Sequence, residues 1–209
     1  MTSPRTRARM VERLRAQGVK DEVVLAAMNS VPRHLFVDEA LAGRAYDDVS
    51  LPINYGQTIS QPYVVARMTE VLRNGKQLGK VLEVGTGCGY QAAVLAQVAQ
   101  QVYSVERIKP LHERARNLLR ELKIRNVILR HADGTSGLNE GAPFDGIIMA
   151  CAAPALSEVL KGQLAVGGRM VLPVGTQEQY LYLVERTESG FKETRLEAVK
   201  FVPLLAGTA

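Results

Sequence analysis

The 209-residue sequence is poor in the side chains that build disulfide frameworks and metal sites. Its only cysteines, Cys88 and Cys151, lie far apart and without metal-ligand spacing. The three histidines, at positions 34, 112 and 131, form no ligand cluster with a cysteine or a carboxylate. These absences predict two reduced thiols and no metal site.

Segments that would direct the chain into or across a membrane are also missing. The longest charge-free run, residues 84–105, is interrupted by four glutamines and three glycines, so it is too polar for a membrane span. The arginine-rich N-terminus is not followed by the apolar stretch of a secretory signal. We therefore expect a cytoplasmic protein that contacts no membrane.

The positive charge is concentrated at the N-terminus. Residues 1–20 hold six basic residues and one acidic residue, a net +5, and the whole chain also sums to +5, so the remaining 189 residues sum to zero. Aromatic residues are not interleaved with these arginines, as they often are in nucleic-acid-binding segments. A solvated helix face explains the charge better, and we expect no nucleic-acid partner.

The order of hydrophobic patterns predicts an α/β fold. Helical periodicity over residues 6–18 and 21–33 precedes a loop-rich stretch that ends near residue 62. Strands are then expected at 80–85, 101–106, 126–133, 144–153, 169–175, 180–187 and 194–204. Helices are expected between them at 90–99, 110–123 and 154–168.

This alternation implies right-handed crossovers and a doubly wound, mostly parallel, Rossmann-like sheet. The last two strands have no helix between them, which indicates an antiparallel edge. We expect one compact domain, with a helical extension and covering loop at 1–77 and a cofactor-binding core at 78–209.

A glycine loop, "LEVGTGCGY", follows the first expected strand. Its spacing is G-x-G-x-G, and the third glycine of the dinucleotide pattern would fall on Tyr90. Glu83 stands two residues before Gly85, where its carboxylate would repel a pyrophosphate but attract a cationic cofactor. S-adenosylmethionine carries a sulfonium and an ammonium group. The loop therefore favours S-adenosylmethionine, with NAD as a distant alternative.

Two more carboxylates end the next two strands. Glu106 lies 21 residues after Gly85, where an acidic residue can accept hydrogen bonds from ribose hydroxyls in either cofactor class. Asp133, followed by Gly134, ends the third strand and could accept from an adenine amino group. Because α/β sheets bind ligands at the carboxyl ends of their strands, we expect these carboxylates and Glu83 on one rim.

The stretch "GQTISQP" places two hydroxyls close together. In an extended backbone, Thr58 and Ser60 point to the same side and could face one target. A second interpretation stays open at this point, in which Ser60 caps the helix that begins after Pro62.

Together these segments resemble the protein-L-isoaspartate (D-aspartate) O-methyltransferases. The resemblance includes "VPRHLFVDEA", "LPINYGQTISQPYVVARMTE", "VLEVGTGCGYQAAVLA" and "VKFVPL". It implies S-adenosylmethionine-dependent methylation of the α-carboxylate of isoaspartyl residues in damaged proteins, after which the ester collapses to a succinimide. The implied partners are isoaspartyl-containing peptides and proteins, and we expect a monomer.

The resemblance also implies roles for residues. Ser60 matches the family's active-site serine, and we expect Thr58 to act with it. The expected cofactor-binding residues are Ile59, Glu83, Gly85, Thr86, Gly87, Gly89, Glu106, Arg107, Asp133 and Gly134. Three positions depart from the family pattern: Thr135 replaces an aromatic residue, Ala150 a threonine and Asn54 a glycine.

A carboxylate acceptor is already ionised at neutral pH, so this reaction needs no general base. The lack of a histidine or cysteine suited to catalysis is therefore expected. Two other interpretations remain: a methyltransferase of the same architecture with a different substrate, and a nucleotide-binding module without catalysis.

Overall fold

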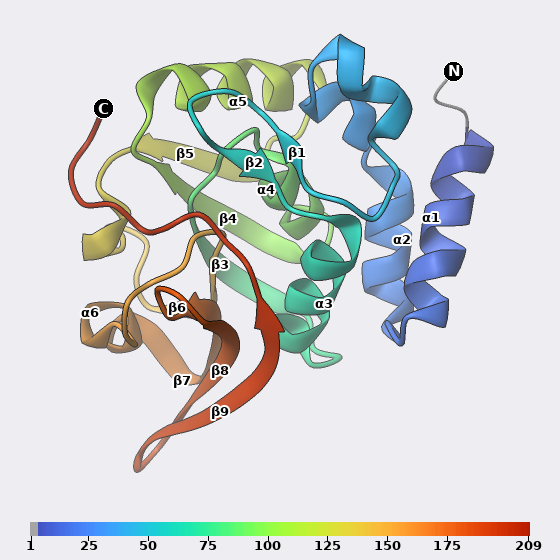
Figure 1. Ribbon diagram of the computed structural model, residues 1–209. Coiled ribbons are helices and arrows are strands. Elements are labelled where there is room, and N and C mark those ends of the chain that lie inside the picture. The colour runs from blue at the N-terminus through green and yellow to red at the C-terminus, as the bar shows by residue number, and fades with distance from the viewer. Residues whose placement is uncertain (1–3) are drawn as a thin grey trace.

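The computed structural model describes residues 4–209 and is built around a seven-stranded sheet of order β5-β4-β3-β6-β7-β8-β9 (Figure 1). Its strands are β3 (Leu78–Val84), β4 (Ala99–Glu106), β5 (Val127–His131), β6 (Phe144–Met149), β7 (Leu164–Val174), β8 (Gln179–Thr187) and β9 (Gly190–Val199). The pairs from β5 to β7 are parallel, and β8 and β9 are antiparallel to their neighbours. The expected fold class and antiparallel edge are confirmed.

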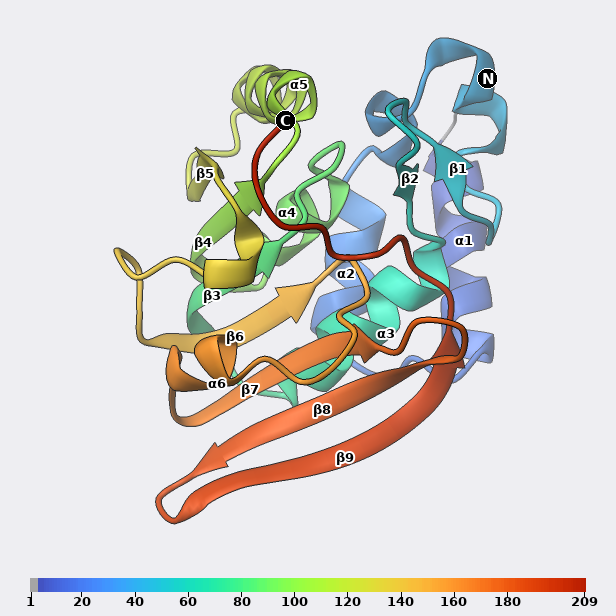
Figure 2. The ribbon, with the colours of Figure 1, turned by 60° about the vertical axis from the view of Figure 1, so that its left-hand side comes forward.

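Helices cover both faces of this sheet, and a two-stranded sheet lies beside its carboxyl edge (Figure 2). The helices are α1 (Pro4–Ala16), α2 (Glu22–Ser30), α3 (Pro62–Arg73), α4 (Tyr90–Leu95), α5 (Lys109–Glu121) and α6 (Glu158–Gly162). The 3-10 helices are η1 (Arg33–Phe36), η2 (Glu39–Arg44) and η3 (Gly134–Ser136), and the small strands are β1 (Leu51–Pro52) and β2 (Thr58–Ile59).

Alternation along β3 explains the two layers. Val81 packs with Leu72 of α3 and Leu95 of α4, whereas Leu82 packs with Leu160 of α6 on the opposite face. Because both faces of this parallel strand are covered, the last four residues of β3 are all buried, Glu83 among them.

Strand order reverses at β3, which has β4 on one side and β6 on the other. The crossovers therefore leave the centre of the sheet in opposite directions and open a crevice at its carboxyl end. Any ligand site is expected in this crevice.

Several predicted boundaries are wrong, as where the strand predicted for 144–153 ends at Met149. Three errors show tertiary pairing prevailing over local periodicity. The helix predicted for 154–168 is only α6, and Leu164 already pairs with Phe144 of β6. The helix predicted for 90–99 ends at Leu95, because Ala99 begins β4 opposite Leu78.

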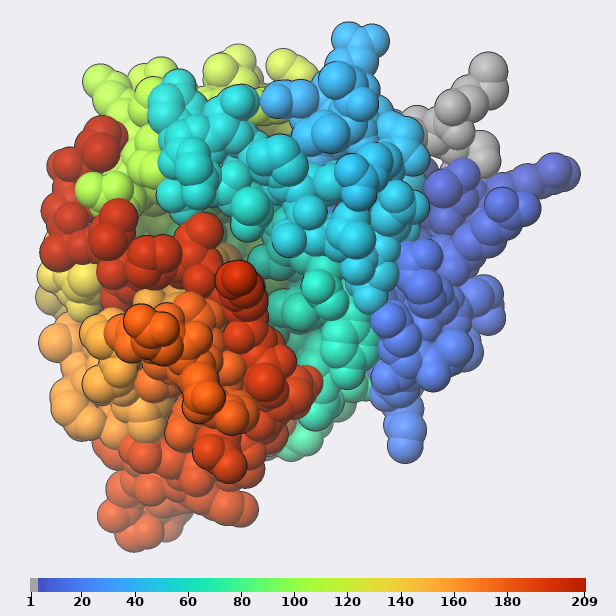
Figure 3. Space-filling model, viewed as in Figure 1, coloured from blue at the N-terminus to red at the C-terminus, as the bar shows by residue number. Residues whose placement is uncertain are grey.

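The third error concerns the strand predicted for 194–204, which starts earlier, at Gly190, and leaves the sheet after Val199. Beyond that point the chain pairs with the segment after β6: Ala152 N donates to Val202 O and Leu204 N donates to Ala152 O, both at 2.8 Å. These bonds turn residues 201–205 across the carboxyl ends of the central strands. Figure 3 shows this red segment between the cyan β1–β2 segment and the orange residues that follow β6.

The N-terminal helices share a core with the sheet domain. Met10 and Leu14 of α1 belong to one buried cluster with Tyr90 and Ala93 of α4. Apolar packing therefore joins residues on both sides of residue 77, and the division of the chain at this residue stays a prediction. Among the described residues, no helix combines the length and hydropathy that a membrane span requires.

An ion pair ties α2 to α3 at this junction. Asp21 caps α2, accepting from Val23 N at 2.9 Å, and also accepts from Arg73 Nε at 2.9 Å. The side chains of Asp21 and Arg73 are only 12% and 8% exposed, so this pair is shielded from water.

Replacing Asp21 should therefore destabilise the protein. We expect Asp21→Ala to lower the free energy of unfolding by about 3 kcal/mol, because it removes a cap and leaves a largely buried guanidinium unpaired. Asp21→Asn keeps a capping oxygen and should lose less. Urea denaturation measures both. Asp47→Ala is the control, since the Arg44–Asp47 pair is exposed on both sides, and an equal loss in that variant would contradict the assignment.

Candidate functional site

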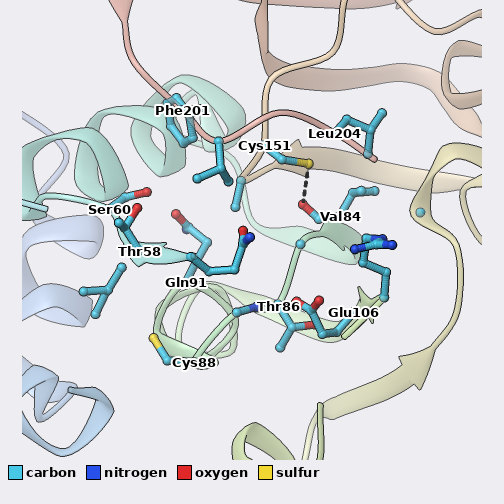
Figure 4. A pocket seen from close by; sticks show the side chains of 18 of the residues that line it. Thr58, Ser60, Val84, Thr86, Cys88, Gln91, Glu106, Cys151, Phe201 and Leu204 are labelled. Carbon is cyan, nitrogen blue, oxygen red and sulfur yellow. Dashed lines mark hydrogen bonds between the residues drawn. The ribbon is translucent and has the colours of Figure 1, made fainter. Parts of the chain in front are cut away.

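A cavity lies at the carboxyl ends of β3, β4 and β6, where the strand order reverses (Figure 4). We call it the glycine-loop cavity. It is lined mainly by residues 57–60, 84–88, 105–108, 150–151 and 201–205, with Gly134. Five segments far apart in the sequence therefore meet at one place.

The glycine loop forms the floor because its backbone can turn tightly. Gly85 has φ 94° and Gly87 has φ 54°, values that side-chain-bearing residues seldom adopt. A Cβ at Gly87 would stand 3.3 Å from the side chain of Ile53, so the loop also needs glycine to pack under the β1–β2 segment. Gly85 N and Thr86 N both donate to Val105 O, which fixes the loop to β4.

Glu106 organises the loop from the end of β4. One carboxylate oxygen accepts from Gly87 N at 2.8 Å and the other from Ile108 N at 2.9 Å. Its side chain lines the cavity, as expected from the sequence. A carboxylate has about four acceptor positions, so two remain for hydroxyl donors.

Glu83 lies beneath the cavity and does not line it. It is fully buried on the α3–α4 face of β3, where Ser104 Oγ donates to one carboxylate oxygen and also contacts Thr86 Oγ1 at 2.6 Å. The other oxygen, Oε1, is buried without a hydrogen-bond partner among the described residues. Burial raises the pKa of Glu83 to about 8.

Asp133 is also outside the cavity lining, although it follows β5 as predicted. Its Oδ1 accepts from Thr135 N and Oγ1, and its Oδ2 accepts from Gly207 N at 2.6 Å. The Gly207 amide and the Thr135 donors lower the pKa of this carboxyl. The expected rim of three carboxylates therefore has one member at the surface of the cavity, one below it and one engaged by the C-terminal segment.

The two hydroxyls of "GQTISQP" face the cavity from β2 and the residue after it (Figure 4). The capping interpretation of Ser60 is wrong, because α3 has Gln61 at its N-cap position and no side-chain cap. Within residues 4–209, neither hydroxyl makes a hydrogen bond, so both are available to a ligand.

A second cavity adjoins the first along the α3 and β9 side. We call it the α3–β9 cavity, and residues 197–202, four side chains of α3, Ser50, Gln61 and Leu181 contribute to its lining. The residues that line both cavities are Thr58, Ser60, Met68, Ala150, Phe201 and Val202. Thr58 and Ser60 thus stand at the border between two spaces.

Nine of the twelve predicted site residues line the glycine-loop cavity. They are Thr58, Ile59, Ser60, Gly85, Thr86, Gly87, Glu106, Arg107 and Gly134. Glu83 and Asp133 are placed as described, and Gly89 takes the N-cap position of α4. The ligand contacts of these residues stay predictions.

Sequence reasoning missed several lining residues. Gln91 of α4 and the C-terminal residues 201–205 carry no chemical signal, and only the resemblance carried by "VKFVPL" drew attention to the latter. Cys88 and Cys151 also line the cavity, but burial raises their thiol pKa values to about 11 and about 12. Both thiols are therefore protonated at neutral pH, in agreement with an inert role for Cys151.

Two of the three departures from the family pattern have local explanations. Asn54 has φ 79°, a left-handed conformation that glycine adopts freely and that asparagine tolerates better than most residues. Thr135 holds Asp133 through its hydroxyl at 2.7 Å. Nothing in the structure explains Ala150.

His131, on the strand next to β4 in the sheet, makes a structural contact: its Nε2 lies 3.0 Å from Arg107 O.

Comparison with known proteins identifies the relatives of this chain. The family model described as protein-L-isoaspartate(D-aspartate) O-methyltransferase matches residues 5–209. A protein-L-isoaspartate O-methyltransferase of Methylobacillus flagellatus is 66% identical over 212 residues, covering 100% of this chain and 95% of the relative. One from Nitrosomonas eutropha is 65% identical over 210 residues, with the same two shares.

Solved structures agree with these sequence relatives. One protein-L-isoaspartate O-methyltransferase superposes with a TM-score of 0.86 at 28% identity. The match covers 94% of this chain and 65% of the chain in the solved structure. Another, a putative one from Plasmodium falciparum in complex with S-adenosyl-L-homocysteine, gives a TM-score of 0.79 at 27% identity. The match covers 95% of this chain and 98% of the Plasmodium chain.

The buried carboxyl of Glu83 predicts a pH-dependent stability. Because its folded-state pKa, about 8, exceeds that of an unfolded glutamate, the folded protein binds this proton more tightly. The contribution of Glu83 to stability is therefore present below the unfolded pKa and is lost as pH rises toward 8. Glu83→Gln removes this titration. The free energy of unfolding of the parent, measured relative to that of Glu83→Gln, should therefore fall by at least about 1 kcal/mol from pH 5 to pH 8.

Denaturation at the two pH values measures that difference. Glu188→Gln, an exposed substitution at the end of β8, should show no such trend. Parallel behaviour of the parent and Glu83→Gln across this range would show that Glu83 titrates normally.

Proposed function

Because the chain belongs to the protein-L-isoaspartate(D-aspartate) O-methyltransferase family, we propose that it methylates L-isoaspartyl residues in damaged proteins with S-adenosylmethionine as donor. The acceptor is the free α-carboxylate of the isoaspartyl residue, and the resulting ester collapses to a succinimide that can reopen to aspartate. The resemblance inferred from the sequence motifs is confirmed by the family match and the relatives.

The observation that carries this proposal is the pair of adjoining cavities with two free hydroxyls at their border. Methyl transfer needs donor and acceptor side by side and in line, so one cavity would hold the cofactor and the other the isoaspartyl residue. Thr58 and Ser60 can donate to an acceptor carboxylate without adding a charge. The acceptor is ionised at neutral pH, so the protein orients it and does not have to remove a proton.

The residues of the glycine-loop cavity fit a cationic nucleoside cofactor. When bound, the cofactor supplies a methyl group on a positively charged sulfur. Gly85 and Gly87 leave the backbone open to close approach, and Glu106 retains acceptor positions for hydroxyls. Glu83 lies under the loop, and its buried Oε1 has no hydrogen-bond partner among the described residues. A bound cation nearby would lower the raised pKa of this carboxyl and so favour its negatively charged form.

We further propose that the enzyme acts as a monomer in the cytoplasm, with neither nucleic acid nor membrane as partner. The exposed large apolar side chains, such as Val23, Tyr55 and Val166, come from separate segments of the chain. This scatter supports a monomer, because subunit interfaces are marked by contiguous apolar patches. Activity toward D-aspartyl residues belongs to the same proposal through the family description.

Methyl transfer to a synthetic isoaspartyl peptide tests the function directly. We expect methyl ester formation with S-adenosylmethionine and none with the same peptide containing ordinary aspartate, because only the isoaspartyl isomer presents a free α-carboxylate. Equal methylation of both peptides, or transfer to RNA or a small molecule alone, would assign a different substrate.

Replacing the border serine tests its orienting role. Ser60→Ala should lower kcat by about 100-fold, because one donor to the reacting carboxylate is lost, while cofactor affinity changes little. Ser189→Ala, in the exposed turn between β8 and β9, is the matched control. Steady-state kinetics and calorimetry separate the two effects, and an unchanged kcat in Ser60→Ala would remove this residue from the reaction.

A further inference from the structure

A second surface feature lies at the opposite edge of the sheet from β9. It is a groove lined by the C-terminal half of α5, the following loop and β5, and we call it the α5–β5 groove. Figures 1 and 2 show α5 next to β5. Its lining residues are Arg116, Leu119, Arg120, Lys123, Ile124, Arg125, Val127, Ile128, Leu129 and Arg130. Half of these are basic, and no acidic residue lines the groove.

Most of these cations have no ion-pair partner in the part of the chain that the structure describes. Arg130 pairs with Glu140 at 2.7 Å, and both side chains are about half exposed. Within residues 4–209, the side chains of the other four basic residues make no ion pair or hydrogen bond. Some basic side chains elsewhere have structural partners, as Arg73 has in Asp21 and Arg169 in Glu185.

The sequence around the groove concentrates positive charge. Residues 109–131 contain seven basic residues and two acidic ones, a net +5. Since residues 21–209 sum to zero, the rest of that stretch carries the balancing negative charge. A concave surface lined by one sign of charge focuses its field and attracts oppositely charged ligands.

Fold stability does not account for this arrangement. Arg116 and Arg120 lie four residues apart on α5, a spacing at which like charges destabilise a helix, and Lys123 follows beyond the end of the helix. The helix dipole favours cations near the last turn of α5, but it does not explain Arg125 in the loop or Arg130 on β5. Residues from three different elements converge on one groove.

We propose that the α5–β5 groove binds an acidic, extended segment of another protein. The cations would pair with aspartate and glutamate side chains, and the floor of Leu119, Ile124 and Val127 would receive apolar side chains between them. No aromatic residue lines the groove, whereas proteins that bind single-stranded nucleic acids stack bases on aromatic rings. This surface is separate from both cavities of the site and does not depend on the proposed function.

Fluorescence anisotropy with labelled peptides tests the proposal. The probe is a twelve-residue peptide that alternates glutamate with leucine or valine, and the comparison peptide replaces each glutamate by glutamine. We expect binding of the acidic peptide only, weakening as salt rises from 50 to 300 mM because the contacts are exposed charge pairs. The double variant Arg116→Glu with Arg120→Glu should weaken binding by about tenfold or more.

A matched control is available on α1. Arg5 and Arg9 have the same four-residue spacing, are exposed, and line none of the described cavities, so Arg5→Glu with Arg9→Glu changes the net charge equally. We expect this control to bind the acidic peptide within about twofold of the parent. Both double variants should retain methyl transfer to a short isoaspartyl peptide, which also shows that they are folded.

Three results would overturn the proposal. An equal loss of peptide binding in both double variants would show non-specific charge attraction. Tighter, groove-dependent binding of a single-stranded RNA of equal charge would assign the groove to nucleic acid. Absence of binding to the acidic peptide at 50 mM salt would exclude a docking site of this chemistry.

Discussion

Parallel hydrogen bonding of β3 to both β4 and β6 is the constraint on which the site depends. It brings the ends of three strands together, and the chain leaving β3 must turn at once because the ends of its neighbours crowd it. The glycine loop makes that turn and is fixed by Val105 O and by the carboxylate of Glu106. The cavity therefore exists because strand order reverses at β3.

The site is completed by segments that contribute little to the sheet itself. The β1–β2 segment brings Thr58 and Ser60 over the glycine loop, and Ile53 packs against the position where Gly87 lacks a side chain. From the other side, residues 201–205 cross the carboxyl edge after pairing with Ala152. Both covering segments contribute residues that line the two cavities together, such as Ser60 and Phe201.

Acidic residues at successive strand ends have different physical states. Glu106 is held by backbone amides and faces the cavity, Asp133 is stabilised in its charged form by donors from Thr135 and Gly207, and Glu83 is buried with a raised pKa. Three carboxylates thus serve as an acceptor facing the cavity, an anchor for the C-terminal segment and a buried group sensitive to nearby charge. The basic α5–β5 groove lies outside this arrangement, at an edge that the site does not use.

The sequence by itself determined the fold class, the order of the main strands and helices, and nine of the residues that line the glycine-loop cavity. Periodicity and glycine placement depend on neighbours in the chain, which is why the loop after β3 and the hydroxyl pair could be identified directly. The loop and Glu83 favoured the cofactor, and the resemblance supplied the substrate.

Only the tertiary structure decided where elements end and which way side chains face. Pairing with β6 placed residues 164–168 of the predicted 154–168 helix in β7, and contact with Ala152 drew residues 201–205 out of the sheet. Glu83 shares a face of β3 with Val81 and does not line the cavity, and it is buried because α3 and α4 cover that face. These outcomes depend on contacts between residues distant in the chain, and local patterns carry no information about them.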